Sequence, residues 1–421
     1  MIRSFCSSRF SRYLLPCCLV FALPASAAEL LTLDRALERA MQNHPQLHQA
    51  QAAVDASKAR SEQARSNLLP QINAGANYVP SLSSSRSSNG ANLSLSADQV
   101  LYDFGQNSNR YEAATVLSSA QEDSWKLARL QVAQEVRAAY FAAKAAESTV
   151  KVALESLQNQ QRHLDQVKGF VQIGTRPPID LAQAQKDVAN AQVQLIEAQN
   201  SFEIAKAQLS QAMGVEEGSF SLASTLMPAV PGEEQSLERL LKEALDHHPE
   251  YASLTKQRNA QTLTVRTIKA VGMPTLRATT RLAEDTTRLS EPSWEAGVAF
   301  SWPLFNGGAT KAQLSEAEAN LAKLDAQLVL LRQRIRLDLE KARLAVKGGK
   351  AAREAAGKST KNAQEQLKLA EGRYLAGLGS VLELGDAQLA LTNAKAQEIQ
   401  VEYKLASARI QLLAALGRTG L

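Results

Sequence analysis

Aromatic residues and cysteines are both scarce in this chain of 421 residues. Only 5% of the sequence is aromatic, and its three cysteines, Cys6, Cys17 and Cys18, all lie within the first 28 residues. Residues 29–421 therefore contain no disulfide and no thiol chemistry. Because 45% of the residues are nevertheless hydrophobic, with Ala, Gln and Leu abundant, the composition favours long, thin helical packing over a thick globular core.

The chain also lacks a strong excess of charge of either sign. It contains 47 basic and 42 acidic residues, but Arg3, Arg9 and Arg12 belong to an N-terminal segment that has no acidic residue. Without that segment, the chain has 44 basic and 42 acidic residues. So small a surplus predicts no nucleic-acid partner, because binding to a phosphate backbone requires many positive charges.

The first 28 residues are typical of a secretory signal peptide. The three arginines precede an apolar run over residues 13–23, and Pro24 is followed by ASAA. This order predicts cleavage after Ala27 or Ala28. A membrane anchor is the alternative interpretation, but the apolar run is shorter than the roughly 20 residues that span a bilayer. Lipid attachment at one of the cysteines is left open.

No motif in the sequence indicates an enzyme. The chain has no P-loop, no nucleophile elbow and no Cys/His set with metal-site spacing. The GGK at 348–350 lacks the upstream glycine of a Walker motif, and we interpret it as a weak spot in a helix. Histidines recur at His44, His48, His247 and His248, and we interpret them as near-surface helix positions. We therefore expect no catalytic residue, no cofactor and no bound metal.

The sequence contains an internal repeat with an offset of about 204 residues. LDRALERAMQNHPQL at 33–47 pairs with LERLLKEALDHHPEY at 237–251. With one deletion, the AMG that ends at 214 aligns with the ALG that ends at 417. This similarity predicts five segments, which are a signal peptide (1–28), a first repeat (29–214), a linker (215–236), a second repeat (237–417) and a tail (418–421).

Each repeat is predicted to hold one helix interrupted by His-Pro and, after a β-hairpin, two longer helices joined by a bend. The bends contain glycine and lie near 169–180 and 372–383. Along the last helix of each repeat, large apolar residues recur every seven positions, as at 181–209 and 384–412, and Ala predominates three positions later. Large residues facing alanine let helices approach closely, so the pattern predicts coiled-coil packing in an elongated bundle.

Two regions with a period of two residues predict the β-hairpins, at 71–102 and 275–304. Each contains two strands of about ten residues with one polar and one apolar face, which is the length of a membrane-spanning β-strand. The polar stretch at 81–90 is predicted to be a loop. Aromatic residues lie at the strand ends, as in a belt at a bilayer interface: Tyr78, Tyr102, Phe104, Trp294, Trp302 and Phe305.

A soluble hairpin that covers one end of the bundle is the alternative interpretation of these strands. If they instead lie in lipid, four strands cannot close a barrel, and unpaired edges cost several kcal/mol per backbone group. The barrel must then be completed by other copies, and three chains would supply twelve strands. The polar faces are predicted to line the pore with Asp98, Arg277, Arg281 and Glu295.

These features together resemble the TolC-type outer membrane efflux family over essentially the whole chain after the signal peptide. The resemblance rests on motifs in a fixed order: ALxxAxxxxPxL at 36–47, LLPQ at 68–71, PLFNGG at 303–308, the bends IGTRPPIDLAQA and AGLGSVLELGDAQL, and the closing ALG. The family implies a mixed α/β membrane fold. In that fold a trimeric 12-stranded β-barrel in the outer membrane, with four strands per chain, continues through the periplasm as a long α-helical coiled-coil barrel.

The resemblance implies that the protein is a passive exit duct of a tripartite efflux or type I secretion system, gated at its periplasmic tip. The expected partners are two further copies of the chain, a periplasmic adaptor, an inner-membrane pump and outer membrane lipid. The alternative function, from another class, is a soluble periplasmic coiled-coil protein that binds partners without forming a pore. Residence in the membrane separates the two.

The resemblance also implies roles for acidic residues just past the bends. Glu383 and Asp386 match the family's acidic ring at the periplasmic aperture, and they share one helix face because they are three residues apart. Asp180 is the matching acid in the first repeat. We therefore expect these three carboxylates at the narrow entrance of the duct.

Closure of the tip and docking of the adaptor are expected at the bends themselves. Tyr374 matches a family tyrosine that helps hold the tip closed. The family's closing arginine is replaced here by Gly379, and Arg176 occupies the equivalent place in the first repeat. The surface where the adaptor docks is expected to include Gly174, Gly377 and Leu378.

Overall fold

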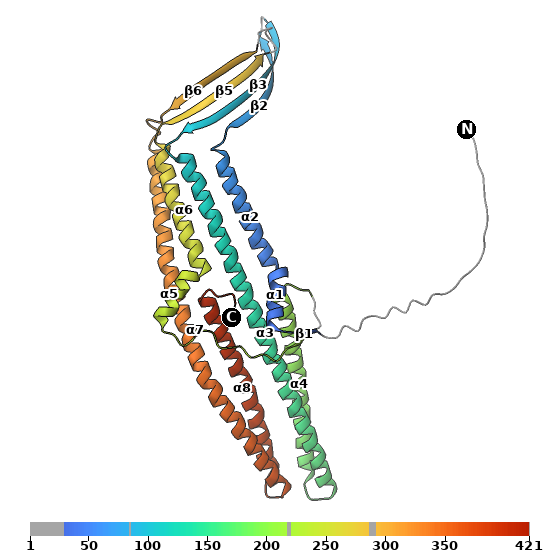
Figure 1. The fold of residues 1–421 in the computed structure, drawn as a ribbon. Coiled ribbons are helices and arrows are strands. Elements are labelled where there is room, and N and C mark those ends of the chain that lie inside the picture. Colours follow the sequence, from blue (N-terminus) through green and yellow to red (C-terminus); the bar gives the residue numbers. More distant parts are fainter. Residues whose placement is uncertain (1–28, 84–85, 217–219, 286–291, 421) are drawn as a thin grey trace, which may run out of the picture.

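The computed structural model describes residues 29–83, 86–216, 220–285 and 292–420. The predicted signal peptide and its cysteines lie outside these residues. The described chain is a long, narrow molecule with a β-sheet at one end and two helical hairpins at the other (Figure 1). The fold thus has the elongated helical form that the low aromatic content favours.

The two halves of the chain contain the same elements in the same order. The helices have 11, 22, 67 and 35 residues in the first half and 11, 23, 67 and 35 in the second. Their bounds are α1 (Leu33–Asn43), α2 (Pro45–Ser66), α3 (Gln106–Gln172), α4 (Pro178–Ala212), α5 (Leu237–His247), α6 (Pro249–Val271), α7 (Ala309–Leu375) and α8 (Val381–Ala415). The strands are β1 (Glu29–Leu31), β2 (Gln71–Ser83), β3 (Arg86–Tyr102), β4 (Phe220–Leu222), β5 (Thr275–Asp285) and β6 (Ser293–Ser301).

The His-Pro pairs separate α1 from α2 and α5 from α6. His44 and His248 both adopt extended backbone angles, because a residue before proline is disfavoured in the helical region. His44 also caps α2, since its Nδ1 accepts a hydrogen bond from the backbone N–H of Gln46 at 3.2 Å. The prediction of a near-surface position is wrong for His248, which is buried at the break where α5 meets α6.

The two longest helices run through most of the molecule. A helix of 67 residues is about 100 Å long at about 1.5 Å per residue. Near the sheet α2, α3, α6 and α7 lie side by side in that order, and toward the other end the order is α4, α3, α8 and α7 (Figure 1). The helices therefore form an open, single-layered array with α2 or α4 at one border and α7 at the other.

Alanine at every seventh residue sets the close packing of the helical hairpins. All five alanines of the α4 stripe are buried against α3: Ala184, Ala191, Ala198, Ala205 and Ala212. In the second half, α7 continues unbroken through Gly348 and Gly349. A Cβ at Gly349 would lie 3.1 Å from Leu405 of α8. Gly349 is thus a place of close helix contact, and the predicted weakness of the helix at this segment stays a prediction.

The largest hydrophobic cluster lies halfway along the molecule, where the segments between the helices cross the array. There β1 and β4 form a short parallel pair, and the buried Tyr140 hydroxyl donates to the backbone oxygens of Leu31 and Ala223. Glu233 is also buried, and its carboxylate pairs with Arg409 of α8 and Lys350 of α7. These contacts tie the linker and the chain's beginning to the middle of the helices.

The sheet at the end of the molecule has the order β2–β3–β5–β6, and every neighbouring pair is antiparallel. The predicted loop at 81–90 is wrong, because β2 and β3 stay paired as far as Ser83 and Arg86. The two strands continue to pair through backbone hydrogen bonds, which satisfy the N–H and C=O groups of this polar stretch. A search for periodic apolar residues cannot detect such pairing. Neither β2 nor β6 has a second strand partner among the described residues, so the sheet has two open edges.

Candidate functional site: a two-faced sheet and a polar groove at the helical tip

The register of the sheet places all four predicted pore residues on one face. Directly opposite residues of antiparallel strands share a face, and residues two apart along a strand share it as well. Arg281 pairs with Glu295 on β6 and with Ser96 on β3, which puts Asp98 and Arg277 on the same side. Most other members of this face are short or polar, including Asn73, Ser94, Ser96 and Thr279, and the same face also carries Val100, Ala283 and Ala299.

The opposite face of the sheet is apolar and uncovered. Val298 is 65% exposed and Phe300 is 67% exposed, although both belong to regular strand structure. The same face carries Ile72, Ala74, Leu93, Leu95, Ala97, Ala278, Leu282, Trp294 and Ala296. An exposed apolar surface that follows a whole sheet marks contact with lipid or with another protein.

Aromatic side chains bound this apolar face at both ends. Trp294 and Tyr78 lie toward the far end of the sheet, and Tyr102, Phe104 and Trp302 lie where the strands meet the helices. Trp294 and Trp302 are eight residues apart, which is about 26 Å at about 3.3 Å per residue. Strands of transmembrane β-barrels tilt by about 35–45°, so this length covers roughly 20 Å of their apolar band, which is about 25 Å tall.

The hairpin tips turn on glycine at corresponding positions. Gly174 after α3 has φ of 75°, and Gly377 after α7 has φ of 73°, a left-handed conformation that glycine adopts without strain. Nothing lies within 4 Å of a Cβ added at either residue. The neighbouring Leu378 is 76% exposed. All three predicted docking residues are therefore at the surface of the tips.

The two tips are joined through Tyr374 and Arg176. The guanidinium of Arg176 lies 5.0 Å from the ring centroid of Tyr374, and its Nη2 donates to the backbone oxygen of Gly379 at 3.4 Å. Tyr374 is only 2% exposed, and burial raises the pKa of its hydroxyl, so it stays neutral at neutral pH. The structure thus brings together the two residues predicted for closure, within one chain.

Gly379, at the place of the family's closing arginine, lies in a tight spot where any side chain would crowd the end of α7. A Cβ at this position would lie 3.1 Å from the backbone nitrogen of Tyr374 and 3.2 Å from the carbonyl carbon of Arg373. The Gly379 N–H instead donates to the backbone oxygen of Arg373 at 3.0 Å. The arginine that bridges the tips therefore comes from the first bend rather than from the second.

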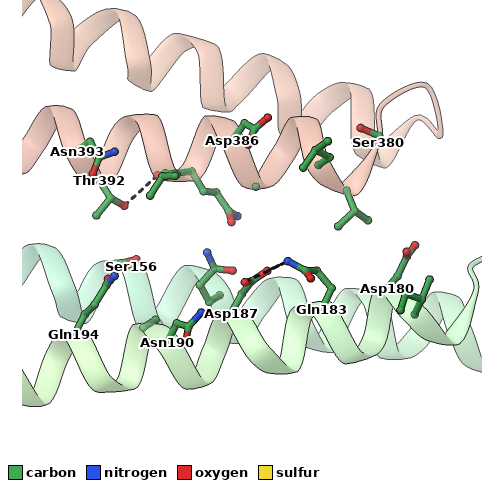
Figure 2. A pocket seen from close by; sticks show the side chains of 18 of the residues that line it. Ser156, Asp180, Gln183, Asp187, Asn190, Gln194, Ser380, Asp386, Thr392 and Asn393 are labelled. Atoms are coloured by element: carbon green, nitrogen blue, oxygen red, sulfur yellow. Dashed lines mark hydrogen bonds between the residues drawn. The ribbon is translucent and has the colours of Figure 1, made fainter.

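A polar groove of about 800 Å³ runs between the starts of α4 and α8 (Figure 2). Asp180 and Asp386, two of the three acids predicted for the aperture, line it from opposite sides (Figure 2). Half of its other lining residues carry amides or hydroxyls, including Gln183, Asn190, Gln194, Gln388, Thr392 and Asn393.

Glu383 lies outside this groove. Its carboxylate pairs with Arg373 at 2.9 Å, and its N–H donates to Ser380 Oγ, which caps α8. The groove contains instead Asp187, which accepts a hydrogen bond from Gln183. Sequence reasoning missed Asp187, although it lies seven residues after Asp180 and therefore on the same stripe of a coiled-coil helix.

Sequence reasoning also missed His163, a buried residue of α3 at the tip. Its ring packs edge-on against Tyr374, with 5.3 Å between the centroids. Burial lowers its pKa, and the nearby Asp187 and Asp180 oppose that shift. Helical spacing could have predicted its burial. Ala153 lies ten residues before it and Val167 four residues after it, and both are buried on the same side of α3.

Within residues 29–420, apart from the short gaps named above, no group of three or more His, Cys, Asp or Glu side chains is arranged to hold a metal ion. None of the described helices combines the length and apolarity that crossing a bilayer requires.

Comparison with known proteins agrees with this geometry. The profile of the family described as "Outer membrane efflux protein" matches residues 36–215 and 240–418. The chain belongs to this family. It is a TolC-type outer membrane protein, as its motifs predicted, and its location is the outer membrane. This location argues against the soluble periplasmic alternative.

The similar proteins cover nearly the whole chain. Outer membrane protein TolC of Escherichia coli strain K12 is 23% identical, over 93% of this chain and 83% of its own length. Protein CyaE of Bordetella pertussis is 24% identical, over 94% of this chain and 86% of its own length. Among solved structures, CusC has a TM-score of 0.83 at 20% identity and 92% coverage of both chains. VceC of Vibrio cholerae has a TM-score of 0.79, also at 20% identity, over 92% of this chain and 96% of its own.

Proposed function

We propose that three copies of this chain form an outer membrane channel with a 12-stranded β-barrel and an α-helical tube below it. The observation that carries the proposal is the sheet, which has two open edges and an apolar face whose large side chains are mostly exposed. Open edges in lipid are unstable, and closure with other copies pairs them. The equal sets of elements in the two halves support two tandem repeats, each supplying two strands and one long helical hairpin.

The channel acts as a passive exit duct, and its polar sheet face lines the pore. Arg281 and Glu295 lie directly opposite each other there, so neighbouring strands present paired charges to the lumen. The family consists of channels rather than enzymes, and no catalytic residue or cofactor is assigned to this chain.

The duct works in a tripartite system with an inner-membrane pump and a periplasmic adaptor. The support comes from the exposed tips, where Gly174, Gly377 and Leu378 are free to be contacted. A relative in Pseudomonas putida is named for pyoverdine export, and the E. coli relative is TolC. By similarity to these relatives, the cargo leaves the cell through the tube, and the pump supplies the energy for export.

The duct is gated at the tips by two features. Arg176 and Tyr374 hold the two hairpins of one chain together. Asp386 and Asp180 place carboxylates at the groove beside them, and three copies would gather these acids around one axis. A ring of carboxylates favours cations.

The test of the proposed function is extraction of the membranes with detergent, followed by mass measurement and single-channel recording in planar bilayers. We expect an outer membrane complex of three chains that conducts ions. A monomer or dimer in the periplasmic fraction would contradict the proposal, as would a membrane trimer that never conducts.

Replacing Asp386 with Asn is expected to lower the cation preference of the channel severalfold. The change removes three carboxylates from the aperture and leaves the side-chain volume almost unchanged. Reversal potentials in a salt gradient measure the effect. The matched control is Glu383→Gln, because Glu383 lies outside the groove and already pairs with Arg373. Equal effects of both variants would remove the distinction between these two acids.

A further inference from the structure

The buried side of the tip contains a polar cluster that closure alone does not explain. Tyr374 of α7 packs against three side chains of the other hairpin: Arg176 lies over its ring, and His163 and Phe170 meet it edge-on. His163 is 7% exposed and Tyr374 is 2% exposed. Among the described residues, neither His163 Nδ1 nor the Tyr374 hydroxyl has a hydrogen-bond partner.

We propose that His163 makes the tip clamp acid-labile, so that protonation of its buried ring separates the α3–α4 hairpin from the α7–α8 hairpin. The inference rests on the proposed gating of the duct at its tips and deepens it, because it names the residue through which the gate is regulated. His163 acts as a positioning residue that supports Tyr374 from within.

The argument begins with what surrounds the imidazole. Arg176 already places one cation on the ring of Tyr374. A protonated His163 would place a second cation against that ring, in a site that excludes water. Like charges around one aromatic ring repel each other, and burying a charge without a hydrogen-bonded partner costs free energy.

The other charged groups of the tip do not remove this effect. Asp180 and Asp187 of α4 attract a proton on His163, but burial outweighs them and the pKa of the imidazole stays below its ordinary value. Asp187 is also engaged by Gln183. On α3 itself, the nearest acid and base toward the tip, Asp165 and Lys168, form an exposed ion pair with each other.

The direction of the pH dependence follows from this lowered pKa. The ordinary pKa of histidine is about 6.5, and it applies when the hairpins separate and the ring meets water. Closure is therefore fully stabilised above about pH 6.5 and weakens as the pH falls through the lowered pKa of the packed ring. For each pH unit between the two pKa values, the equilibrium constant for closure falls by up to about tenfold.

The experiment is hydrogen–deuterium exchange of the full-length trimer in lipid, followed by mass spectrometry between pH 7.5 and pH 5. Exchange rates are corrected for the intrinsic dependence on pH. We expect residues 160–176 and 370–380 of the wild type to exchange about tenfold faster at the acid end. His163→Phe keeps an aromatic ring without a titrating group, and its tips are expected to exchange at the same rate throughout.

Two further variants keep the test decisive. His163→Gln replaces the ring with a neutral polar side chain and is expected to lose the pH response even if phenylalanine disturbs the packing. His48→Gln, at an exposed position on α2, is the matched control and should respond as the wild type does. A wild-type response in both His163 variants would overturn the inference, and so would a wild type whose tips do not respond to acid.

Bilayer conductance of the same samples separates this inference from the proposed function. If exchange at the tips depends on His163 while conductance does not change with pH, the acid-labile clamp holds and the tip is not the gate. If conductance rises in acid equally in the wild type and His163→Phe, the tip gate survives and the role of His163 is refuted.

Discussion

Replacing Gly417 with Ala is expected to destabilise the protein by about 2–5 kcal/mol and to reduce its assembly strongly. Gly417 follows α8 with φ of 73°, a conformation that disfavours any side chain. A Cβ there would also lie 2.9 Å from the Cα of His248, in the backbone of the α5–α6 break. Because backbone cannot move aside as a flexible side chain can, α8 would have to shift. The midpoint of thermal unfolding measures the effect.

The matched control is Gly377→Ala at the tip. Gly377 has the same φ of 73°, but nothing lies within 4 Å of an added Cβ. It should therefore lose only the roughly 1–2 kcal/mol of the left-handed conformation. Equal losses in the two variants would show that the close approach to His248 contributes nothing. Gly214→Ala offers a second test in the first half, since its Cβ would lie 2.8 Å from the Cα of His44.

Replacing Val298 with Arg is expected to abolish insertion into the outer membrane. Val298 lies near the middle of β6 on the apolar face, between the aromatic ends of the sheet. An arginine at the middle of the lipid-facing surface of a β-barrel costs about 2–4 kcal/mol, and the trimer would carry three of them. The amount of trimer recovered from outer membranes should fall by more than about tenfold.

Gly297→Arg is the control for this variant. It introduces the same charge at the neighbouring residue, which faces the other side of the sheet beside Thr279. Both positions are exposed in the single chain, so the folding of one chain does not distinguish them. The two variants should differ in membrane insertion only if one face of the sheet contacts lipid and the other contacts water. Recovery of Val298→Arg at the level of Gly297→Arg would refute a lipid-facing apolar surface.

Periodicity predicted the helices and strands well because each long helix has one buried stripe and each strand of the sheet has one apolar face. The alanines of α4 recur every seven residues, and the structure buries all five of them. The strand regions 71–102 and 275–304 likewise alternate with a period of two. The same reasoning failed at 81–90, where polar residues of both strands stay paired. Backbone hydrogen bonds form whatever the side chains are, so the spacing of apolar residues does not reveal them.

Individual contacts at the tip could not be predicted, because they depend on which helices meet. Sequence spacing put Glu383 and Asp386 on one helix face, but the structure pairs Glu383 with Arg373 and leaves Asp386 in the groove. His163 and Tyr374 are more than two hundred residues apart in the chain. Their rings come to a centroid distance of 5.3 Å only because the two hairpins meet at the tip, where α8 packs against α3.

The sequence by itself determined the element order, the two-faced strands, the glycine turns and the family. Each of these depends on residues that are close together in the sequence or on motifs in a fixed order. The tertiary structure decided which acids line the groove, how tightly the end of α7 surrounds Gly379, and that His163 packs against Tyr374. Those properties arise from distances between segments remote in sequence, and only close packing sets such distances.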